Sequence, residues 1–338
     1  MFIGHALLAF AVAALVAERW GWDDRNALLL GVVAGAFAAA PDADIAYALV
    51  GLVEWNPGEG PFAASTAFWD ASRLVHRSVT HSLVVGALAA PAFGLVAAGV
   101  RNRERGLGLE GAAGATTLLA LVAVVFVADG PLAAFVMGTF VVAGVLVAAA
   151  AARWTSLSPA AVALAALWGL WSHPWGDLVT GSPPDLLYPL EATPLSARVV
   201  LHPDPTLHLL GAFALELAVI WLALAAVCRL TDRTLPTLID RRAVAGTTYG
   251  IVALAATPPT LEVSYHFVFS ILGVGLVCGA IRSSPSLPPS LSSRVRSLRR
   301  TLEASTVDGA LEAASTAMAA VTVALVTYAA VYASFVAT

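Results

Sequence analysis

Apolar residues fall into long runs along the chain, separated by charged or Pro/Gly-rich segments. A run of about 20 apolar residues is long enough to cross a bilayer as an α-helix. Asp129-Gly130-Pro131 marks either a tight turn between two helices or a break within one long helix. The segment 45–53 is too short to cross, so it either extends the preceding helix or lies re-entrant. The pattern predicts ten helices, over residues 2–18, 27–40, 79–100, 112–128, 132–152, 159–172, 207–227, 243–257, 262–281 and 313–336.

The composition places these helices in a membrane. Of the 338 residues, 59% are hydrophobic and 12% are charged, and the mean hydropathy is +0.82. Soluble domains carry about 25% charged residues, so this chain has too little charge to cover a water-facing surface. A soluble enzyme, a disordered protein and a nucleic-acid-binding domain are therefore excluded. We predict an all-α fold, a polytopic transmembrane bundle of about ten helices (eight to ten), in the plasma membrane.

The positive charges predict the orientation of this bundle. All 18 basic residues are arginines, and loops rich in arginine stay on the cytoplasmic side. With ten spans and an extracytoplasmic N-terminus, 15 of the 18 arginines lie on the cytoplasmic side, and Arg73, Arg77 and Arg198 lie outside. We therefore expect both termini to be extracytoplasmic. The segment 283–300 is then a basic, Pro/Ser-rich cytoplasmic linker.

Histidines and aspartates gather in four short clusters. An ionisable side chain costs about 2.5–3.5 kcal/mol in the middle of a span, so those present are usually paired or functional. In the orientation derived from the arginines, all four clusters emerge at the extracytoplasmic face. Each cluster alone has an ordinary structural explanation, but their convergence on one face predicts a single site. The clusters are centred on His5, on Pro41-Asp42-Ala43-Asp44, on the segment from His76 to Ser82, and on the segment from Ser172 to Asp177.

The spacing within the clusters limits their geometry. His173 and Asp177 are four residues apart, so on a helix they share one face. His76 and His81 are five residues apart and converge only if His76 lies in the loop before the helix. Asp42 and Asp44 are two residues apart, which suits an extended or turn segment after Pro41 and not a helix.

These residue types are typical ligands of a divalent metal. Imidazole and carboxylate together suit zinc, with manganese or iron as alternatives. Such a metal lowers the pKa of bound water and polarises a phosphoryl or acyl oxygen. We expect Asp42 or Asp44 to act as a base and Arg77 to stabilise the charge on a phosphate. The candidate metal ligands are His5, Asp42, His76, His81, His173 and Asp177.

In this order, the clusters resemble the YdjM-like family of LexA-regulated, membrane-bound metal-dependent hydrolases. That family is distantly similar to the α-helical zinc-dependent phospholipase C superfamily, which also uses a His-x-x-x-Asp metal pair. The further His and Glu ligands of those soluble enzymes have few obvious counterparts here. The resemblance rests on His5, on Pro41, Asp42 and Asp44, on His76, Arg77, Thr80, His81 and Ser82, and on Ser172, His173, Asp177, Tyr188 and Pro189.

The resemblance implies a membrane-embedded hydrolase-like domain over residues 1–190, with additional transmembrane helices over 191–338. The implied reaction is metal-assisted hydrolysis of a phosphoester, with a lipid or its headgroup as the substrate, at the extracytoplasmic face. Two other classes fit the same residues. One is a transporter of a metal ion or small solute, and the other is a non-catalytic membrane protein with a vestigial site. The expected surroundings are a lipid bilayer, and no nucleic acid.

Overall fold

A computed structural model describes residues 2–56, 58, 60–73, 75–102, 108–192, 194–280 and 295–337, and within these residues it contains helices and loops but no strand. The expected all-α fold is therefore confirmed. The chain divides into two compact units, Met1–Val199 and Val200–Thr338, and each is described by itself.

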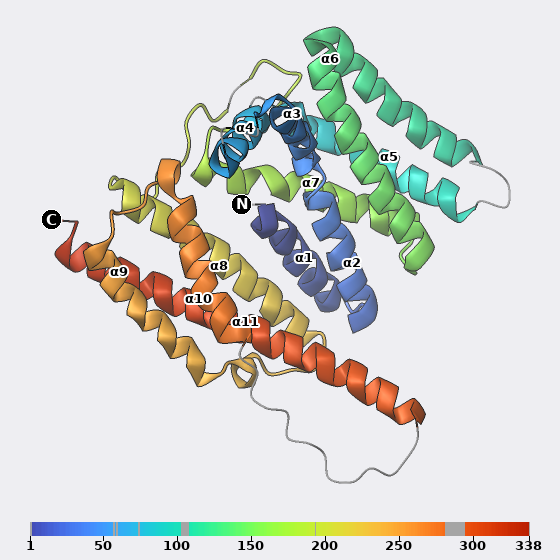
Figure 1. Ribbon diagram of the computed structural model, residues 1–338. Helices are drawn as coiled ribbons and strands as arrows, with labels where there is room; N and C mark the ends of the chain where they lie inside the picture. The colour runs from blue at the N-terminus through green and yellow to red at the C-terminus, as the bar shows by residue number, and fades with distance from the viewer. Residues whose placement is uncertain are drawn as a thin grey trace. The chain divides into compact units, whose positions relative to one another are not determined.

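The first unit holds the helices that carry the four polar clusters (Figure 1). Most of the helices predicted for this unit have a counterpart within a few residues. Its elements are α1 (Phe2–Arg19), α2 (Asp24–Ala38), the 3₁₀ helix η1 (Pro41–Tyr47), α3 (Ala48–Glu54), α4 (Pro61–Arg73), the 3₁₀ helix η3 (Val79–His81), α5 (Leu83–Arg101), α6 (Gly108–Trp154) and α7 (Pro159–Thr180).

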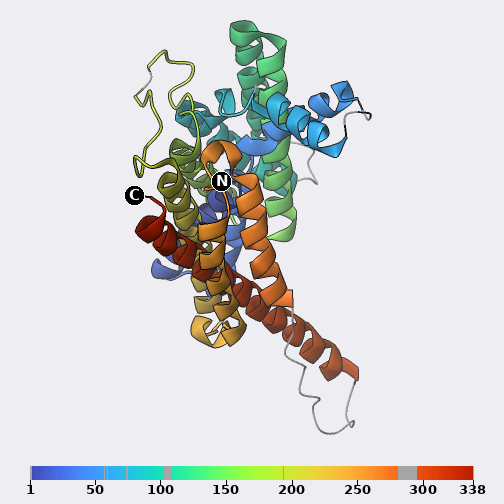
Figure 2. The ribbon, with the colours of Figure 1, turned by 60° about the vertical axis from the view of Figure 1, so that its left-hand side comes forward.

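The long element α6 contains the two predicted helices 112–128 and 132–152. Gly130 lies between them with φ 84° and ψ −170°, which are not helical values. A φ of this sign is readily adopted by glycine alone. The chain reverses there, and the two legs of α6 are visible on either side of the bend in Figures 1 and 2. Of the two alternatives for Asp129-Gly130-Pro131, the turn is therefore the one found.

Small residues let the helices of the first unit approach closely. A Cβ added at Gly35 of α2 would lie 2.7 Å from the carbonyl oxygen of Ala6 in α1. A Cβ added at Gly169 of α7 would lie 2.4 Å from the carbonyl oxygen of Ala34 in α2. Such contacts are typical of helix pairs in membranes, where close packing replaces the hydrophobic effect as the force between helices.

Four helices of the first unit begin or end beside the histidine clusters. α1 and α5 begin, and α2 and α7 finish, beside the histidine clusters; we call this the histidine end. The opposite ends of these helices are tied together by hydrogen bonds from Arg101 Nη2 to the carbonyl of Thr155 and from Ser156 Oγ to Asn26 Oδ1. We call this the arginine end, because it carries Arg19, Arg25, Arg101 and Arg153.

The second unit is also helical, but two of its predicted spans are shorter than expected. Residues 243–257 form a 3₁₀ helix followed by the seven-residue α9, and residues 262–281 form η6 and the 16-residue α10. The linker predicted over 283–300 lies outside the described residues as far as 294, and helix begins at Val295. The unit comprises α8 (Pro205–Arg229), η4 (Leu235–Leu238), η5 (Arg241–Thr248), α9 (Tyr249–Ala255), η6 (Leu261–Val263), α10 (Tyr265–Ala280) and α11 (Val295–Phe335).

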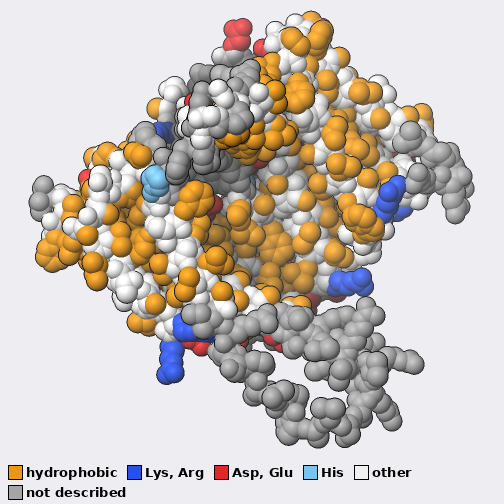
Figure 3. Space-filling view, in the orientation of Figure 1, with side chains coloured by type: hydrophobic (Ala, Val, Ile, Leu, Met, Phe, Trp, Pro, Cys, Tyr) orange, Lys and Arg blue, Asp and Glu red, His pale blue; other side chains and the backbone are white. Residues whose placement is uncertain are grey.

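Helix length and hydropathy identify four candidate membrane spans in the described residues, in α5, α6, α8 and α11. A fifth is possible if α2 and the segment Pro41–Val53, which is bent from it by 44°, form one broken span or a re-entrant loop. The expected count of about ten spans is therefore not confirmed, because several helices are too short or too polar to cross alone. Exposed side chains on the face in Figure 3 are nevertheless mainly hydrophobic.

The contact at Gly169 makes a test of this packing possible. We expect Gly169→Ala to destabilise the protein by about 1–3 kcal/mol, because the added methyl group meets backbone atoms that cannot move aside. Thermal unfolding in detergent measures the change. Gly138→Ala in α6 is the matched control, since nothing lies within 4 Å of its Cβ position, and it should not lower the melting temperature. Equal melting temperatures for the two variants would contradict this account.

Candidate metal centre

The structure brings all six predicted ligand residues together at the histidine end. His5 lies in the first turn of α1, Asp42 in η1, and His81 at the end of η3. His173 and Asp177 lie in the last part of α7, and His76 lies in the turn before η3. Five of the six are almost fully buried, and only His76 keeps a partly exposed side chain.

Four donor atoms at the centre of this cluster form a ring. His173 Nε2 lies 3.5 Å from Asp42 Oδ1 and 3.8 Å from Asp177 Oδ2. His81 Nε2 lies 3.7 Å from the same oxygen of Asp42 and 3.5 Å from the same oxygen of Asp177. Each imidazole nitrogen thus faces both carboxylates.

The helical geometry predicted for His173 and Asp177 is found. α7 continues to Thr180, eight residues beyond the predicted end at 172, and it passes through Pro174. The two side chains therefore lie one turn apart on the same face. Gly176, between them, has no side chain, and a Cβ there would lie 2.5 Å from the Cε1 atom of His5. The glycine lets the His5 ring approach α7.

The prediction for Asp42 and Asp44 was wrong in one respect. Both lie in the 3₁₀ helix η1 rather than in an extended segment or a simple turn. The tighter winding of a 3₁₀ helix, about three residues per turn, separates the two side chains around its axis. Asp42 supplies one atom of the ring, whereas Asp44 is fully buried against His76.

His76 occupies the loop position that convergence with His81 required. Its Nδ1 lies 3.2 Å from Asp44 Oδ2 and 3.8 Å from Asp42 Oδ1. Burial lowers the pKa of His76, but the hydrogen bond and negative charge of Asp44, with the charges of Asp42 and Asp177, outweigh this effect. The pKa is therefore raised above its usual value.

Backbone and hydroxyl groups orient the two central histidines. His173 Nδ1 lies 2.6 Å from the carbonyl oxygen of Ala38 and donates its proton there. His81 Nδ1 lies 3.1 Å from Thr80 Oγ1, whose own proton points to the carbonyl oxygen of Pro41 at 3.4 Å. With Nδ1 protonated in both imidazoles, each Nε2 presents its lone pair to the carboxylate oxygens of Asp42 and Asp177. Histidine ligands of metals are commonly held in this way.

The four potential metal-ligand atoms of the ring have no hydrogen-bond partner among the described residues. Both oxygens of Asp42, Oδ2 of Asp177, and Nε2 of His81 and of His173 are buried and unbonded. Their separations of 3.5–3.8 Å exceed the usual range of a hydrogen bond, about 2.7–3.2 Å. Buried polar groups normally have partners, so this arrangement fits a metal ion. Three groups of residues could hold one: His5, Asp42 and His173; Asp42, His76 and His81; and His81, His173 and Asp177.

Arg77 closes the site at the end of α7. Its Nη2 donates to Asp177 Oδ1 at 3.1 Å and to Thr180 Oγ1 at 3.2 Å, and its Nη1 donates to the carbonyl of Ser182 at 3.4 Å. The φ of Arg77 is 66°, in the left-handed region that non-glycine residues rarely adopt. Strained backbone of this kind often occurs at functional sites.

Two residues of the family-like pattern have a supporting role. Ser82 caps the N-terminus of α5, accepting hydrogen bonds from the amides of Val84 and Val85, and donates to the carbonyl of Tyr188. Tyr188 donates its hydroxyl proton to Asp129 at the bend of α6, and burial with this carboxylate raises the pKa of Tyr188 to about 12. These bonds tie the loop after α7 to the rest of the unit.

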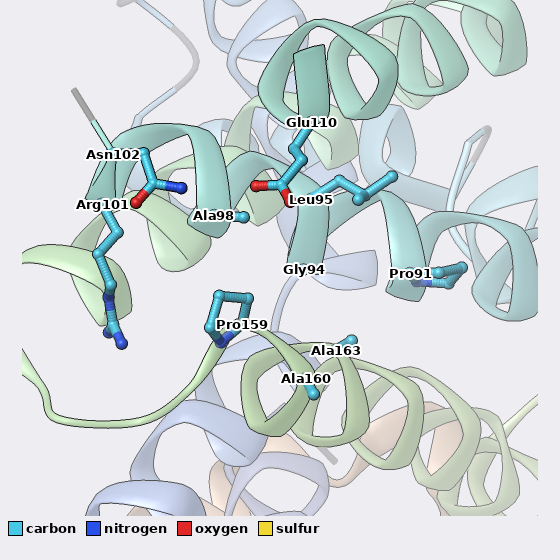
Figure 4. Close-up of a pocket in the computed structure, with 10 residues that line it drawn as sticks. All are labelled: Pro91, Gly94, Leu95, Ala98, Arg101, Asn102, Glu110, Pro159, Ala160 and Ala163. Atoms are coloured by element: carbon cyan, nitrogen blue, oxygen red, sulfur yellow. The ribbon is translucent and has the colours of Figure 1, made fainter. Parts of the chain in front are cut away.

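The sequence did not indicate every group in the site. The Ala38 carbonyl that orients His173 is a backbone atom and leaves no mark in the sequence. Thr80 did have a signal, since it immediately precedes His81, but its role as a hydrogen-bond partner was not predicted. A cavity of about 470 Å³ at the arginine end of α5 and α7, with Arg101, Asn102 and Glu110 at its rim (Figure 4), includes none of the candidate residues.

Comparison with known proteins agrees with the expected family. The chain matches the family described as YdjM inner membrane protein over residues 1–235, which extends the likeness beyond the 190 residues covered by the motifs. No curated protein and no solved structure matches the chain. The more distant likeness to zinc-dependent phospholipase C is not shown by these comparisons. With its long apolar helices, the chain is a multi-pass membrane protein that belongs to the YdjM inner membrane protein family.

Proposed function

We propose that the protein is a membrane-bound, metal-dependent hydrolase that cleaves a phosphoester in a lipid or its headgroup. The observation that supports this most directly is the ring of buried, unbonded donors from Asp42, His81, His173 and Asp177. No hydrogen bond among the described residues satisfies these atoms. A bound cation would.

The four adjacent separations in the ring are compatible with zinc, and each group of mutually close ligand atoms holds either Asp42 or Asp177. Zinc bonds to histidine nitrogen and carboxylate oxygen are about 2.0–2.2 Å long and tetrahedrally arranged, which places neighbouring ligand atoms about 3.3–3.6 Å apart. The four separations of 3.5–3.8 Å lie at or just above this range. Manganese or iron remains an alternative with the same ligands. His5 and His76, at the two ends of the cluster, are further candidate ligands.

A metal in this ring would lower the pKa of water and polarise the phosphoryl oxygen of a substrate. The protein's own groups would supply the rest. Asp44 belongs to none of the three possible ligand groups, so it is the better placed of the two predicted bases, and it is hydrogen-bonded to His76. Arg77 would stabilise negative charge on the phosphate, as guanidinium groups commonly do.

Substrate would reach the site past His76 and Arg77. Their side chains are 19% and 17% exposed, whereas those of His81, His173 and Asp177 are at most 1% exposed. The Nε atom of Arg77 is buried and has no hydrogen-bond partner among the described residues, so it could donate to a phosphate only if the guanidinium moved. A polar entrance on an otherwise apolar unit suits a substrate with a charged headgroup.

We further propose that the site faces the extracytoplasmic side. Within the first unit, Arg19, Arg25, Arg101 and Arg153 all lie at the arginine end, opposite the histidines. Arginine-rich ends stay cytoplasmic. This argument depends on one unit alone and does not require ten spans.

The metal can be tested directly. We expect the purified protein to hold a transition metal and His173→Ala and His81→Ala to lose most of it, because each removes one donor of the ring. Elemental analysis of folded protein measures the content. His202→Ala is the matched control, since His202 is exposed and its Nδ1 accepts only a local bond from the amide of Asp204. Wild-type protein with far less than one metal per chain would disprove the proposed site.

The reaction class needs a separate experiment. We expect purified protein in detergent to hydrolyse a phosphodiester such as a phospholipid headgroup, and a chelator or Asp42→Asn to reduce the rate by at least about 100-fold, the scale of one catalytic group. If the protein instead moves a metal ion or solute across sealed vesicles and hydrolyses nothing, it is a transporter. If neither activity depends on these residues, the site is vestigial.

A further inference from the structure

The two oxygens of Asp177 have different surroundings. Oδ2 faces His81 and His173 in the ring of donors and has no hydrogen-bond partner. Oδ1 lies 3.1 Å from Arg77 Nη2 and 3.4 Å from His5 Nε2. Oδ1 thus contacts two basic side chains, whereas Oδ2 has no hydrogen bond and remains available to a metal ion.

Both of these side chains lie against a glycine of α7 or its cap. A Cβ at Gly176 would lie 2.5 Å from Cε1 and 2.8 Å from Nδ1 of His5. A Cβ at Gly181 would lie 1.4 Å from Nη1 and 2.5 Å from Cζ of Arg77. All four distances are shorter than real Cβ contacts. A side chain at either position would therefore displace the basic group from Asp177.

The backbone does not require glycine at either position. Gly181 caps α7 with φ −164° and ψ −159°, extended values that any residue adopts. Gly176 lies inside the helix, where glycine is less favourable than alanine by about 1 kcal/mol. Glycine at position 176 therefore carries a cost in helix stability, and what it provides at both positions is space.

We propose that Gly176 and Gly181 are positioning residues for Asp177. They leave the space in which His5 and Arg77 hold Oδ1, so that the carboxylate presents Oδ2 alone to the metal. This inference rests on the proposed function, and it makes His5 a support of Asp177 rather than a direct ligand. Arg77 contacts Asp177, Thr180 and Ser182 through its Nη atoms, and its Nε is buried, so a role toward phosphate would require the guanidinium to shift.

Metal affinity tests the proposal. We expect Gly181→Ala to weaken Zn²⁺ binding, measured by competition with a chelating indicator, by about 10–100-fold, the usual effect of losing a group that orients a ligand. Arg77→Gln should weaken it similarly. The double variant should be no weaker than Arg77→Gln alone, because both changes break the same contact. The same pattern is expected for Gly176→Ala with His5→Ala.

Control variants distinguish the positioning role of the two glycines from the metal site itself and from direct ligation by His5. Gly138→Ala has no neighbour within 4 Å of its Cβ position and should bind Zn²⁺ like wild type. If Gly181→Ala and Gly176→Ala also bind like wild type, or if their effects add fully to those of Arg77→Gln and His5→Ala, the inference is wrong while the metal site stands. A larger loss for His5→Ala than for Gly176→Ala, by 100-fold or more, would make His5 a ligand and overturn its assignment here.

The inference remains testable in chelator-treated protein. Without metal, Arg77 is still the cationic partner of a buried carboxylate, so Gly181→Ala and Arg77→Gln should both lower the melting temperature, again without adding. Wild-type protein that binds no Zn²⁺ but shows this non-additive pattern would contradict the proposed function and leave the positioning of Asp177 intact. Absence of the pattern would contradict the positioning itself.

Discussion

The burial of two carboxylates, Asp42 and Asp177, inside an apolar helical unit is the constraint that the rest of the site must satisfy. An ionised carboxylate moved out of water is costly unless charge and hydrogen bonds compensate it. Here the surrounding groups are imidazoles and one guanidinium, and they satisfy only part of each carboxylate, since three of the four oxygens have no hydrogen-bond partner among the described residues. The remaining deficit is positive charge. A divalent cation at the proposed site would supply it.

The packing achieves this by bringing helix ends together rather than helix centres. His5 starts α1, His81 precedes α5, and Asp177 lies in the last turns of α7. At helix ends the backbone still has free carbonyl groups, and the carbonyl of Ala38, the last residue of α2, fixes the imidazole of His173. Glycine and alanine at the crossings let these ends meet, because a larger residue at Gly35 or Gly169 would separate α2 from α1 or α7. The apolar part of each helix therefore determines where its polar end lies.

Much of this arrangement could be predicted from the sequence, because charge is scarce in the chain. With few ionisable residues in apolar surroundings, each cluster was easy to recognise. The four-residue spacing of His173 and Asp177 predicted that they share one face of a helix. The span count could not be predicted as well. Apolar runs near 15 residues do not distinguish a crossing helix from a short buried one, and residues 243–257 are divided between a 3₁₀ helix and the seven-residue α9. The local conformation of η1 and the partners of Arg77 depend on tertiary contacts, so no local pattern could reveal them.

Arg77 shows how such contacts decide a residue's role. Its position in the sequence, next to His76, indicated only a cation near the site, and phosphate binding was the natural interpretation. Its left-handed backbone turns the side chain toward the end of α7, where Asp177, Thr180 and the carbonyl of Ser182 receive its protons. The guanidinium therefore offsets part of the cost of burying Asp177 whether or not a substrate is present. A cation committed in this way can act on a phosphate only if its guanidinium shifts, because its one unbonded nitrogen, Nε, is buried.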